Sequence, residues 1–474
     1  MVLLAVAVGL LLLLAGVLRV VYGVRRRRSS RGRPVRLTAG QDGRPSSRDR
    51  DLGVVDGGGR LAIVVPGVGG TGLESSKGRA WVPWWMFLPK GVIKRHAEWK
   101  RRVAVIYDQA TDDYVSKDRS IRPVPGARGI NKLLSSKAPK KGRGIPPKSK
   151  GRWMSVEERL QLGYSYLLEK LVGANFRVEG HGYDFRRITG AECWSAWCDG
   201  LEQLILAESE PVSIYAHSFG GLMLHAFLVD RGARVWGRIA SVVMIANPWR
   251  GARTALRTML MGMRTGLLGP SGQQAWVQDV ISNFSCILAN LPTPATGESP
   301  DDPLVTWGER SWGYRDLVGL MYETGNVSSV EPYLRNVVPW LESHGLLGDR
   351  PLAGRALLSP ECRLSSVVPV DGGRSGLDRS YKVVKRSSRN KYAKSGSFAA
   401  EYQLTQATTF ADRGDGTVDA VSLRAWTELL DAAEADRVEF LELPGTDHAT
   451  VVTENGRHLD HIVALGMPRA AGAG

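Results

Sequence analysis

Short apolar runs alternate with stretches of helical spacing along most of the chain. Leu61–Val65 and Ile239–Ala246 are continuous apolar runs, which is the composition of buried strands. Arg437–Leu443 instead alternates between polar and apolar residues, as a strand with one buried face does. Apolar residues at helical spacing predict helices over Val156–Leu171 and Trp194–Leu206. Two more strands are predicted at Val103–Tyr107 and Val212–Tyr215.

The stretch Val212–Leu222 passes from strand to turn to helix within a few residues. A β-branched and aromatic strand is followed by the small residues of Ala216–Gly221, with Ser218 at the tip of the turn. This order is the nucleophile elbow of a serine hydrolase, which needs small residues because its backbones approach closely. Ala216 stands where the usual G-x-S-x-G pattern has its first glycine, so an ordinary turn is an alternative interpretation of this motif alone.

A glycine-rich loop, Pro66–Gly72, directly follows the first apolar strand. Such a loop can cradle phosphate, but G-x-G-x-x-G and G-K-[ST] are both absent from it. The alternative is the oxyanion loop of a hydrolase, which the nearby serine motif favours. The predicted oxyanion donors are the backbone amides of Val68 and Phe219.

A nucleophilic serine needs a base and a carboxylate that orients the base. In this fold they follow the serine in the order acid, then histidine. Asp415 lies in G-D-G-T-V, where two glycines make a tight turn, and His448 follows the last predicted strand. Asp412 and Asp419 are alternative acids, and a surface turn is an alternative role for the Asp415 motif. Among the other histidines, His217 adjoins the serine but is expected to leave the turn in another direction.

A dense aromatic cluster interrupted by prolines lies at Trp81–Pro89. It is interpreted either as ordinary core or as a lid or membrane-contact loop, since tryptophan favours the water–lipid interface. Trp81, Trp84 and Trp85 are therefore candidate substrate or lid residues.

The chain begins with an apolar run, Val2–Val24, that is about long enough to cross a bilayer. No charged side chain precedes the run, which favours a retained anchor over a cleaved signal peptide. The basic flank Arg25–Arg28 would keep that end in the cytoplasm by the positive-inside rule. Two glycosylation sequons, at Asn283 and Asn326, point to the other side, although sequons also arise by chance. The side of the membrane is left open.

The formal net charge of +16 would suggest a nucleic-acid partner if it were spread over a folded surface. Much of it lies instead in Arg25–Arg50 and Lys137–Arg152, which are rich in Gly, Pro and Ser and typical of mobile basic segments. Nucleic-acid binding is therefore not expected. Lys137–Arg152 is interpreted as a solvated loop or as a contact with anionic lipid headgroups.

The four cysteines are too few for a disulfide scaffold and show no C-x-x-C zinc spacing. Cys193 and Cys198 could pair across a loop. No metal site and no cofactor are predicted for this chemistry.

The length of 474 residues accommodates one large α/β domain with insertions, or two smaller domains. The pattern weakens between Ala252 and about Tyr402, as expected of an inserted cap. The predicted organisation is a transmembrane anchor at 1–24, a basic flexible tether at 25–59, a catalytic domain at 60–467 with a lid and basic insertion at about 74–155 and a cap at about 252–402, and a disordered tail at 468–474.

Taken together, these motifs resemble the lecithin:cholesterol acyltransferase family, which includes phospholipid:diacylglycerol acyltransferases and related phospholipases. The resemblance runs in family order over most of Leu61 to about Leu465. It is carried by P-G-V-G-G-T-G-L-E from Pro66, the stretch Trp81–Trp85, G-Y-D-F-R from Gly182, A-H-S-F-G-G around Ser218, N-P-W-R-G-A from Asn247, G-D-G-T-V around Asp415 and D-H at His448. It implies an α/β-hydrolase fold, with a mostly parallel central sheet flanked by helices, a cap and a mobile lid.

The resemblance also implies a triad of Ser218, Asp415 and His448 that transfers an acyl chain from a phospholipid. Diacylglycerol or a sterol would accept the chain in a transferase, and water would accept it in a phospholipase. A transferase is favoured because the anchor would keep the enzyme beside acceptor lipids. A catalytically silent lipid-binding scaffold is a third hypothesis. In a eukaryotic cell the expected location is the endoplasmic reticulum membrane.

Some residues depart from the family pattern. No cysteine lies between Glu74 and Asp113, although a disulfide flanks the lid in secreted members. Phe185 stands where tryptophan is usual, and Arg250 follows Trp249, a further candidate substrate residue, where a small residue is common. Anchored members are typically luminal, which conflicts with the basic flank after the apolar run.

Overall fold

The computed structural model describes residues 59–81, 93–131, 163–262, 277–294, 297–347, 356–370, 378–388, 396–409, 414–454 and 456–467. All of them belong to one compact unit, Arg50–Gly474. The predicted anchor at 1–24, nearly all of the tether, the basic segment Lys137–Arg152 and the tail at 468–474 lie outside these ranges. Across the ranges that are described, no helix is both long and apolar enough to span a membrane.

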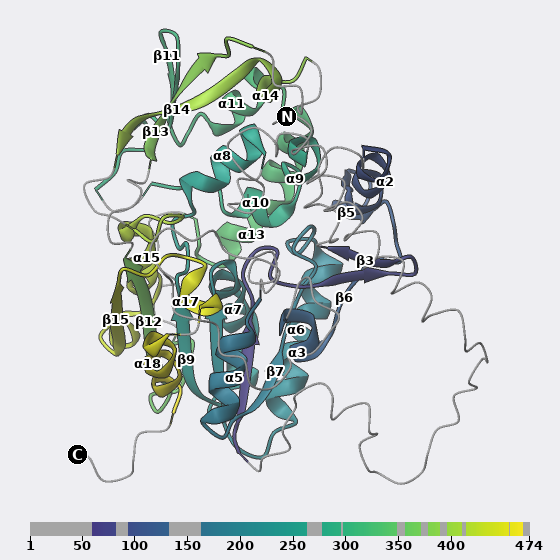
Figure 1. The fold of residues 1–474 in the computed structure, drawn as a ribbon. Coiled ribbons are helices and arrows are strands. Elements are labelled where there is room, and N and C mark those ends of the chain that lie inside the picture. The colour runs from purple at the N-terminus through teal and green to yellow at the C-terminus, as the bar shows by residue number, and fades with distance from the viewer. Residues whose placement is uncertain are drawn as a thin grey trace, which may run out of the picture. The chain divides into compact units, whose positions relative to one another are not determined.

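A six-stranded sheet of order β15-β12-β9-β8-β1-β7 forms the centre of the unit (Figure 1). Every neighbouring pair of strands in it is parallel. The predicted strand Leu61–Val65 is confirmed, and three other predicted strands are confirmed to within two residues at each end. The strands are β1 (Leu61–Val65), β7 (Arg177–Gly180), β8 (Val212–His217), β9 (Ile239–Ile245), β12 (Arg363–Val370) and β15 (Val438–Pro444).

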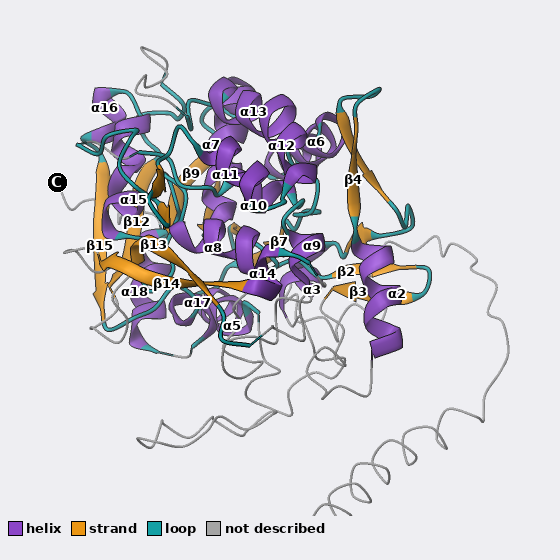
Figure 2. Cartoon of the chain, turned by 90° about the horizontal axis from the view of Figure 1, so that it is seen from above, coloured by secondary structure: helices purple, strands orange, loops and turns teal. Residues whose placement is uncertain are grey.

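Alternate residues of β1 belong to two different hydrophobic clusters. Ile63 packs in the cluster that includes α6 and α7, whereas Ala62 and Val64 pack in the cluster that includes α5, α17 and α18. Because successive side chains of a strand point to opposite faces, helices bury both faces of the sheet. Figure 2 shows these two groups of helices on opposite sides of the strands. The flanking helices are α5 (Ser165–Gly173), α6 (Ala191–Leu206), α7 (Phe219–Arg231), α17 (Thr450–Thr453) and α18 (Arg457–Leu465).

The predicted helix at Trp194–Leu206 is confirmed as α6, which begins three residues earlier. The predicted helix at Val156–Leu171 corresponds in part to α5, and residues 156–162 lie outside the described ranges.

The range predicted as a cap, 252–402, contains a strand of the central sheet. β12 pairs with β9 on one side and with β15 on the other. The prediction of one insertion over this range is therefore wrong for Arg363–Val370. The chain instead leaves the central sheet twice, once between β9 and β12 and again between β12 and the loop that carries Asp415.

We use the term cap for the described elements of these two excursions. The first supplies most of the helices, and the two together supply a four-stranded sheet of order β11-β10-β13-β14. Figure 1 shows the cap beyond the carboxyl ends of the central strands. Its elements are α8 (Arg253–Met261), α9 (Gln278–Ile281), α10 (Ser285–Ala289), β10 (Val305–Trp307), β11 (Arg310–Trp312), α11 (Leu317–Glu323), η5 (Val327–Ser329), α12 (Val330–Pro332), η6 (Tyr333–Val337), α13 (Val338–Ser343), β13 (Asp378–Lys385), α14 (Phe398–Glu401) and β14 (Tyr402–Thr409).

The strand predicted at Val103–Tyr107 is only partly correct. Val103 is the last residue of α2, and the strand that follows pairs with β5 in a separate two-stranded ribbon. The remaining elements are β2 (Leu73–Ser75), β3 (Gly78–Trp81), α2 (Ile93–Val103), β4 (Val105–Asp108), β5 (Asp113–Ser116), β6 (Arg122–Pro123), α3 (Gly126–Asn131), η3 (Gly232–Arg234), α15 (Ala420–Arg424), η7 (Ala425–Leu429) and α16 (Ala432–Ala435).

The structure changes the interpretation of a cysteine pair and of a glycosylation sequon. Cys193 and Cys198 lie on the single helix α6 and are both free, so the disulfide considered between them is not formed. The sequon residue Asn326 is buried, and its amide accepts from Gln278 and donates to Thr324. This sequon is therefore poor evidence for a glycosylated, luminal protein.

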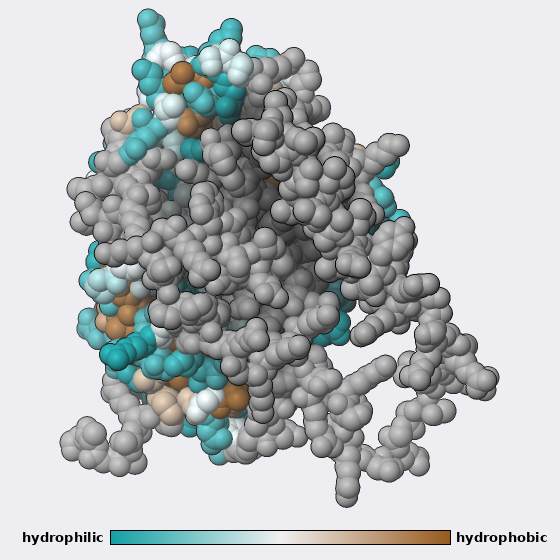
Figure 3. All heavy atoms as spheres, viewed as in Figure 1, coloured by the Kyte–Doolittle hydropathy of each residue, from teal (hydrophilic) through white to brown (hydrophobic). Residues whose placement is uncertain are grey.

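Exposed apolar side chains are scattered over the described surface. Ile106, Trp236, Tyr322 and Phe440 belong to separate parts of the chain. Among the residues that are coloured in Figure 3, hydrophobic ones appear in small groups between hydrophilic ones. Single exposed apolar side chains of this kind are normal for a folded protein.

Candidate active site

Ser218 forms the sharp turn between β8 and α7. Its backbone has φ 54° and ψ −130°, which is strained for a residue with a side chain. Two hydrogen bonds fix the turn, from the Ser218 amide to the Ile245 carbonyl at 2.8 Å and from Asn247 Nδ2 to the Ser218 carbonyl at 2.6 Å. Ala216, in place of the usual first glycine, lies within β8 and is buried. The serine is thus held at the amino end of a helix, where negative charge is favoured.

Close backbone packing explains the small residues around this turn. A Cβ atom at Gly220 would lie 2.6 Å from two carbonyl oxygens at the end of β1 and in the loop after it. At Gly221 it would lie 2.0 Å from Asn247 Nδ2, and at Gly67 it would lie 2.6 Å from the Cβ atom of Ser218. All of these distances are too short for any residue larger than glycine.

The structure brings Ser218, Asp415 and His448 together in hydrogen-bonding order. His448 Nε2 lies 2.8 Å from Ser218 Oγ, and His448 Nδ1 lies 2.5 Å from Asp415 Oδ2. The carboxylate is fully buried, whereas the imidazole keeps some exposure. This is the geometry required of a nucleophile, a base and the acid that orients the base.

The acid loop fixes the orientation of the Asp415 carboxylate. Its Oδ1 atom accepts hydrogen bonds from the amides of Thr417 and Val418 at 2.9 and 2.8 Å, which leaves Oδ2 to His448. The Asp415 carbonyl also accepts from the His448 amide at 2.9 Å. Gly416 has φ 83°, a conformation that favours glycine. The acid and the base are therefore tied to each other by backbone as well as side chain.

The alternative acids do not occupy this position. Asp419 accepts from the Ser422 amide at the start of α15 and forms an ion pair with Arg253 of the cap, at 3.1 Å. Asp412 lies outside the described residues.

Three aromatic side chains hold the glycine-rich loop after β1. Tyr183 Oη donates to the Pro66 carbonyl at 2.9 Å, and Trp81 Nε1 donates to the Gly69 carbonyl at 3.0 Å. The Gly67 amide donates to Tyr164 Oη at 2.7 Å. The loop is thus fixed from three separate segments of the chain.

The two predicted oxyanion donors are left available. Within the described part of the chain, neither the Val68 amide nor the Phe219 amide has a hydrogen-bond acceptor. The Gly67 amide is used by Tyr164, and the Gly70 amide donates to the Gly67 carbonyl at 3.0 Å. Free amides beside Ser218 are what a developing oxyanion requires.

The candidate substrate tryptophans that are described lie in the core. Trp81 is buried and packs edge-on against Phe185, with ring centroids 5.0 Å apart. Trp249 is buried and stacks on Trp426 at 5.7 Å. Their contacts are those of core residues rather than of the predicted lid or substrate surface. Trp84 and Trp85 lie outside the described residues.

The G-Y-D-F-R motif, Gly182–Arg186, holds the oxyanion loop through the hydrogen bond from Tyr183 to Pro66. Asp184 and Arg186 form a buried two-bond ion pair, with distances of 2.8 and 2.7 Å. Arg186 also donates to the Val103 carbonyl at 3.1 Å, which ties the motif to the end of α2. Burial raises the pKa of Asp184, but the adjacent Arg186 outweighs it and leaves the pKa below its ordinary value. The rigid pair positions Tyr183, which bonds to the loop.

The sequence analysis assigned no role to three residues that contact this site: Tyr164, His217 and Asn247. Asn247 belongs to a family motif, but nothing in its neighbourhood indicated a bond to the elbow. His217 adjoins the serine, and its ring nitrogens lie 2.8 Å from Tyr164 Oη and 2.9 Å from the His448 carbonyl. Tyr164 carried no signal, because the fold alone brings it to the loop.

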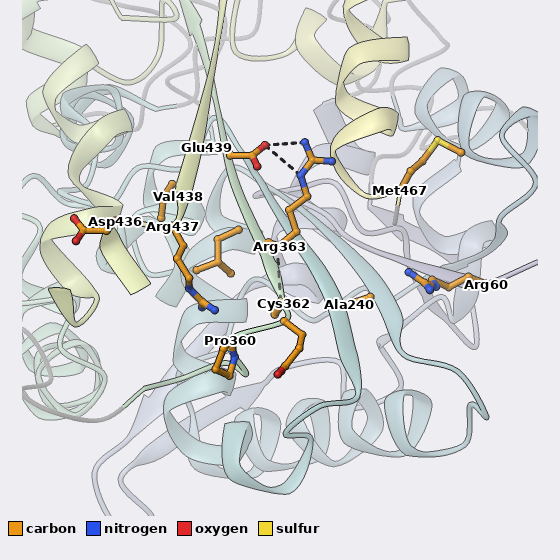
Figure 4. Close-up of a pocket in the computed structure, with 12 residues that line it drawn as sticks. Arg60, Ala240, Pro360, Cys362, Arg363, Asp436, Arg437, Val438, Glu439 and Met467 are labelled. Carbon is orange, nitrogen blue, oxygen red and sulfur yellow. Dashed lines mark hydrogen bonds and ion pairs between the residues drawn. The ribbon is translucent and has the colours of Figure 1, made fainter. Parts of the chain in front are cut away.

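A cavity of about 520 Å³ lies at the opposite end of the sheet (Figure 4). Its lining residues Arg60, Ala240, Arg363 and Val438 stand at or just before the amino ends of four strands, and Arg363 pairs with Glu439. The triad follows the carboxyl ends, so this cavity is separate from the candidate active site. In the ranges that the structure describes, no three His, Cys, Asp or Glu side chains are grouped as metal ligands would be.

Comparison with protein families gives one match. The family described as lecithin:cholesterol acyltransferase matches residues 77–319, just over half of the chain. This stretch contains Ser218 and the G-Y-D-F-R motif but ends before Asp415 and His448, whose assignment depends on the geometry described above. No curated protein matches the chain by sequence.

Several solved structures are similar to the chain at low identity. The Tle4–Tli4 complex gives a TM-score of 0.45 at 13% identity, over 86% of this chain and 97% of that chain. A carboxylesterase from the ammonia-oxidizing thaumarchaeon Nitrososphaera gargenis gives 0.28 at 15%, over 64% and 83%. The Bacillus licheniformis lipase BlEst2 gives 0.27 at 10%, over 64% and 84%. These scores are all below 0.5, and the assignment of an α/β-hydrolase fold rests on the parallel sheet and the elbow after β8.

Proposed function

Since the chain belongs to the lecithin:cholesterol acyltransferase family and is an acyltransferase or lipase-type enzyme, we propose that it transfers a fatty acyl chain from a phospholipid to diacylglycerol or a sterol. The observation that carries the proposal is the hydrogen-bonded series from Ser218 through His448 to Asp415. Val68 and Phe219 would supply the oxyanion amides.

In the first half of the reaction, Ser218 Oγ attacks an acyl ester carbonyl of the phospholipid. His448 Nε2 takes the hydroxyl proton, and Asp415 Oδ2 holds the Nδ1–H of His448 so that Nε2 faces the serine. The tetrahedral oxyanion lies between the free amides of Val68 and Phe219. His448 then protonates the departing lysophospholipid oxygen, which leaves an acyl ester on Ser218.

In the second half, an alcohol attacks the acyl-serine. His448 removes the proton of the alcohol and returns it to Ser218 Oγ as the new ester leaves. Water in place of the alcohol gives a free fatty acid with the same residues, so a phospholipase is the alternative. The apolar run Val2–Val24 supports a membrane anchor, which would raise the local concentration of acceptor lipids.

The test uses the full-length protein with vesicles of acyl-labelled phosphatidylcholine, with and without diacylglycerol or a sterol. A Ser218→Ala variant is the matched control. Label in triacylglycerol or steryl ester that disappears in the variant establishes the transferase. Serine-dependent label in free fatty acid alone would instead identify a phospholipase. Absence of any serine-dependent release would reject both enzymes and leave the scaffold.

A further inference from the structure

The reaction described above does not use two buried polar side chains that lie directly beside it. Tyr164 precedes α5, and His217 is the last residue of β8. Tyr164 Oη lies 2.7 Å from the Gly67 amide nitrogen and 2.8 Å from His217 Nδ1. His217 Nε2 lies 2.9 Å from the His448 carbonyl oxygen. Together they form one continuous series of hydrogen bonds.

The direction of each hydrogen bond in this series follows from its ends. The Gly67 amide can only donate, so Tyr164 Oη accepts from it and gives its own proton to His217 Nδ1. The His448 carbonyl can only accept, so His217 carries its proton on Nε2. The series is fully satisfied only by a neutral His217 imidazole with this tautomer.

The surroundings of His217 also favour the neutral form. Burial, together with the neighbouring His448, lowers the pKa of His217 to about 3. The two imidazole rings have centroids 5.2 Å apart. A charged His217 would therefore repel the imidazolium that forms on His448 during catalysis, whereas a neutral one leaves that charge to Asp415.

We propose that Tyr164 and His217 are positioning residues that hold two loops at a fixed spacing around Ser218: the oxyanion loop after β1, and the base loop, which carries His448 between β15 and α17. This inference rests on the triad chemistry proposed above. Gly67 precedes the Val68 amide, and the bond to His448 is made at its own backbone carbonyl. The series thus joins the oxyanion loop and the loop that carries His448 through the residue next to the nucleophile.

The sheet alone does not provide this connection. The base loop follows β15 at one edge of the sheet, and β12 and β9 separate that strand from β8. The oxyanion loop, Pro66–Gly72, follows β1, which lies on the other side of β8. A displacement of either loop by about 1 Å would misalign the reacting groups and can cost about 100-fold in rate.

The test compares Tyr164→Phe with a matched control, Tyr215→Phe. Tyr215 is equally buried, and its hydroxyl also donates one hydrogen bond, to the Val463 carbonyl at 2.9 Å, but it takes no part in the series. Each substitution removes one buried hydroxyl. Tyr164→Phe leaves the Gly67 amide and His217 Nδ1 without that partner, and Tyr215→Phe leaves the Val463 carbonyl without it. We expect both to lower Tm by a few degrees.

The variants are compared by kcat and KM on a soluble ester, p-nitrophenyl butyrate, and by the rate of labelling with a fluorophosphonate. Tyr164→Phe should lower kcat and the labelling rate by roughly tenfold to 100-fold with KM changed by less than about twofold. Tyr215→Phe should change all of these by less than about twofold. Equal effects of the two variants on kcat would mean that Tyr164 and His217 contribute only to packing, and would overturn the proposal.

His217 provides a second test that does not depend on the folding of Tyr164→Phe. Glutamine can accept from Tyr164 and donate to the His448 carbonyl, whereas leucine can do neither. His217→Gln should therefore retain most of the activity, and His217→Leu should lose as much as Tyr164→Phe. Loss of activity in both His217 variants to the same extent would overturn the positioning role.

The tautomer can be read in the unmodified protein by nitrogen-15 NMR of histidine-labelled full chain. The proposal requires a neutral His217 with its proton on Nε2, and a proton on Nδ1 would overturn it. This reading is independent of turnover. A wild-type protein that shows this tautomer but does not react with fluorophosphonate at Ser218 would reject the proposed enzyme, and with it the reaction that the pair would serve.

Discussion

Replacing the Asp415 carboxylate by an amide should impair catalysis through the tautomer of His448. Oδ1 of Asp415 accepts from the amides of Thr417 and Val418, so in Asp415→Asn the carbonyl oxygen must occupy that position. The new NH2 group is then forced toward His448 Nδ1, the atom that lies 2.5 Å from Oδ2. An N–H donor there makes Nδ1 the acceptor and places the imidazole proton on Nε2, facing Ser218.

A protonated Nε2 atom cannot accept the serine proton. The expected loss is about 10⁴-fold in kcat, which corresponds to about 5.5 kcal/mol of transition-state stabilisation. Steady-state hydrolysis of a soluble ester measures it, and KM should change little because the substrate does not contact this carboxylate. Thermal unfolding reports whether the buried amide is accommodated.

Asp447→Asn is the matched control for this substitution. Asp447 stands one residue before His448 and accepts from the amides of Ala449 and Thr450 through Oδ1, which asparagine can also do. Its kcat should stay within about twofold of wild type. A loss of less than about tenfold in Asp415→Asn, with the fold intact, would refute the assignment of Asp415 as the orienting acid.

Three further predictions follow from packing and charge. Gly221→Ala should destabilise the protein by about 1–3 kcal/mol and abolish fluorophosphonate labelling, because the new Cβ atom would lie 2.0 Å from Asn247 Nδ2; urea unfolding and gel-based labelling measure the two effects. The folded pKa of Asp184 lies below its ordinary value of 3.8, so the stability that the carboxylate contributes is present above that pH and is lost as pH falls toward the folded pKa. Asp184→Asn removes the charge that pairs with Arg186 and should lower the free energy of unfolding at pH 7 by about 3–5 kcal/mol. Tm measured from pH 7 to pH 2.5 should therefore fall more steeply in wild type than in this variant. Asn326 should carry no glycan in protein purified from a glycosylating host, since both atoms of its buried amide are bonded; intact-mass analysis with and without glycosidase decides this.

The strands that could be predicted from the sequence are those whose pattern of apolar and polar residues matches their burial in the sheet. β1 is a continuous apolar run because helices cover both faces of the sheet, and the elbow is recognisable because close backbone packing restricts Gly220 and Gly221. Asp415 and His448 could be predicted as well, since chain order and loop position are properties of the sequence itself.

β12 could not be recognised in the same way. It contains Ser365 and Ser366, which are both buried, and Pro369, which lacks the amide that a central strand normally uses. Its pairing with β9 ends at Val367, so the proline lies beyond that ladder. Only the pairing with the neighbouring strands reveals that this stretch, which mixes buried serines with valines, belongs to the central sheet.

The positions of Trp81, Trp249, Tyr164 and His217 depend on contacts between distant segments. A tryptophan-rich stretch has the same composition whether it lines a lid or fills a core, and Trp81 and Trp249 are core residues. Tyr164 and His217 are 53 residues apart and meet only because the turn before α5 lies against the end of β8. Such contacts are set by the tertiary fold.

The central claim is that Ser218 carries the acyl chain between donor and acceptor. The most direct measurement is to mix the full-length protein with vesicles of acyl-labelled phosphatidylcholine, quench in acid within one turnover, and analyse the digested peptides by mass spectrometry. We predict an acyl ester on the Ser218 side chain that accumulates when acceptor lipid is omitted and disappears when it is added. Consumption of phosphatidylcholine without acylation of Ser218 would contradict the account.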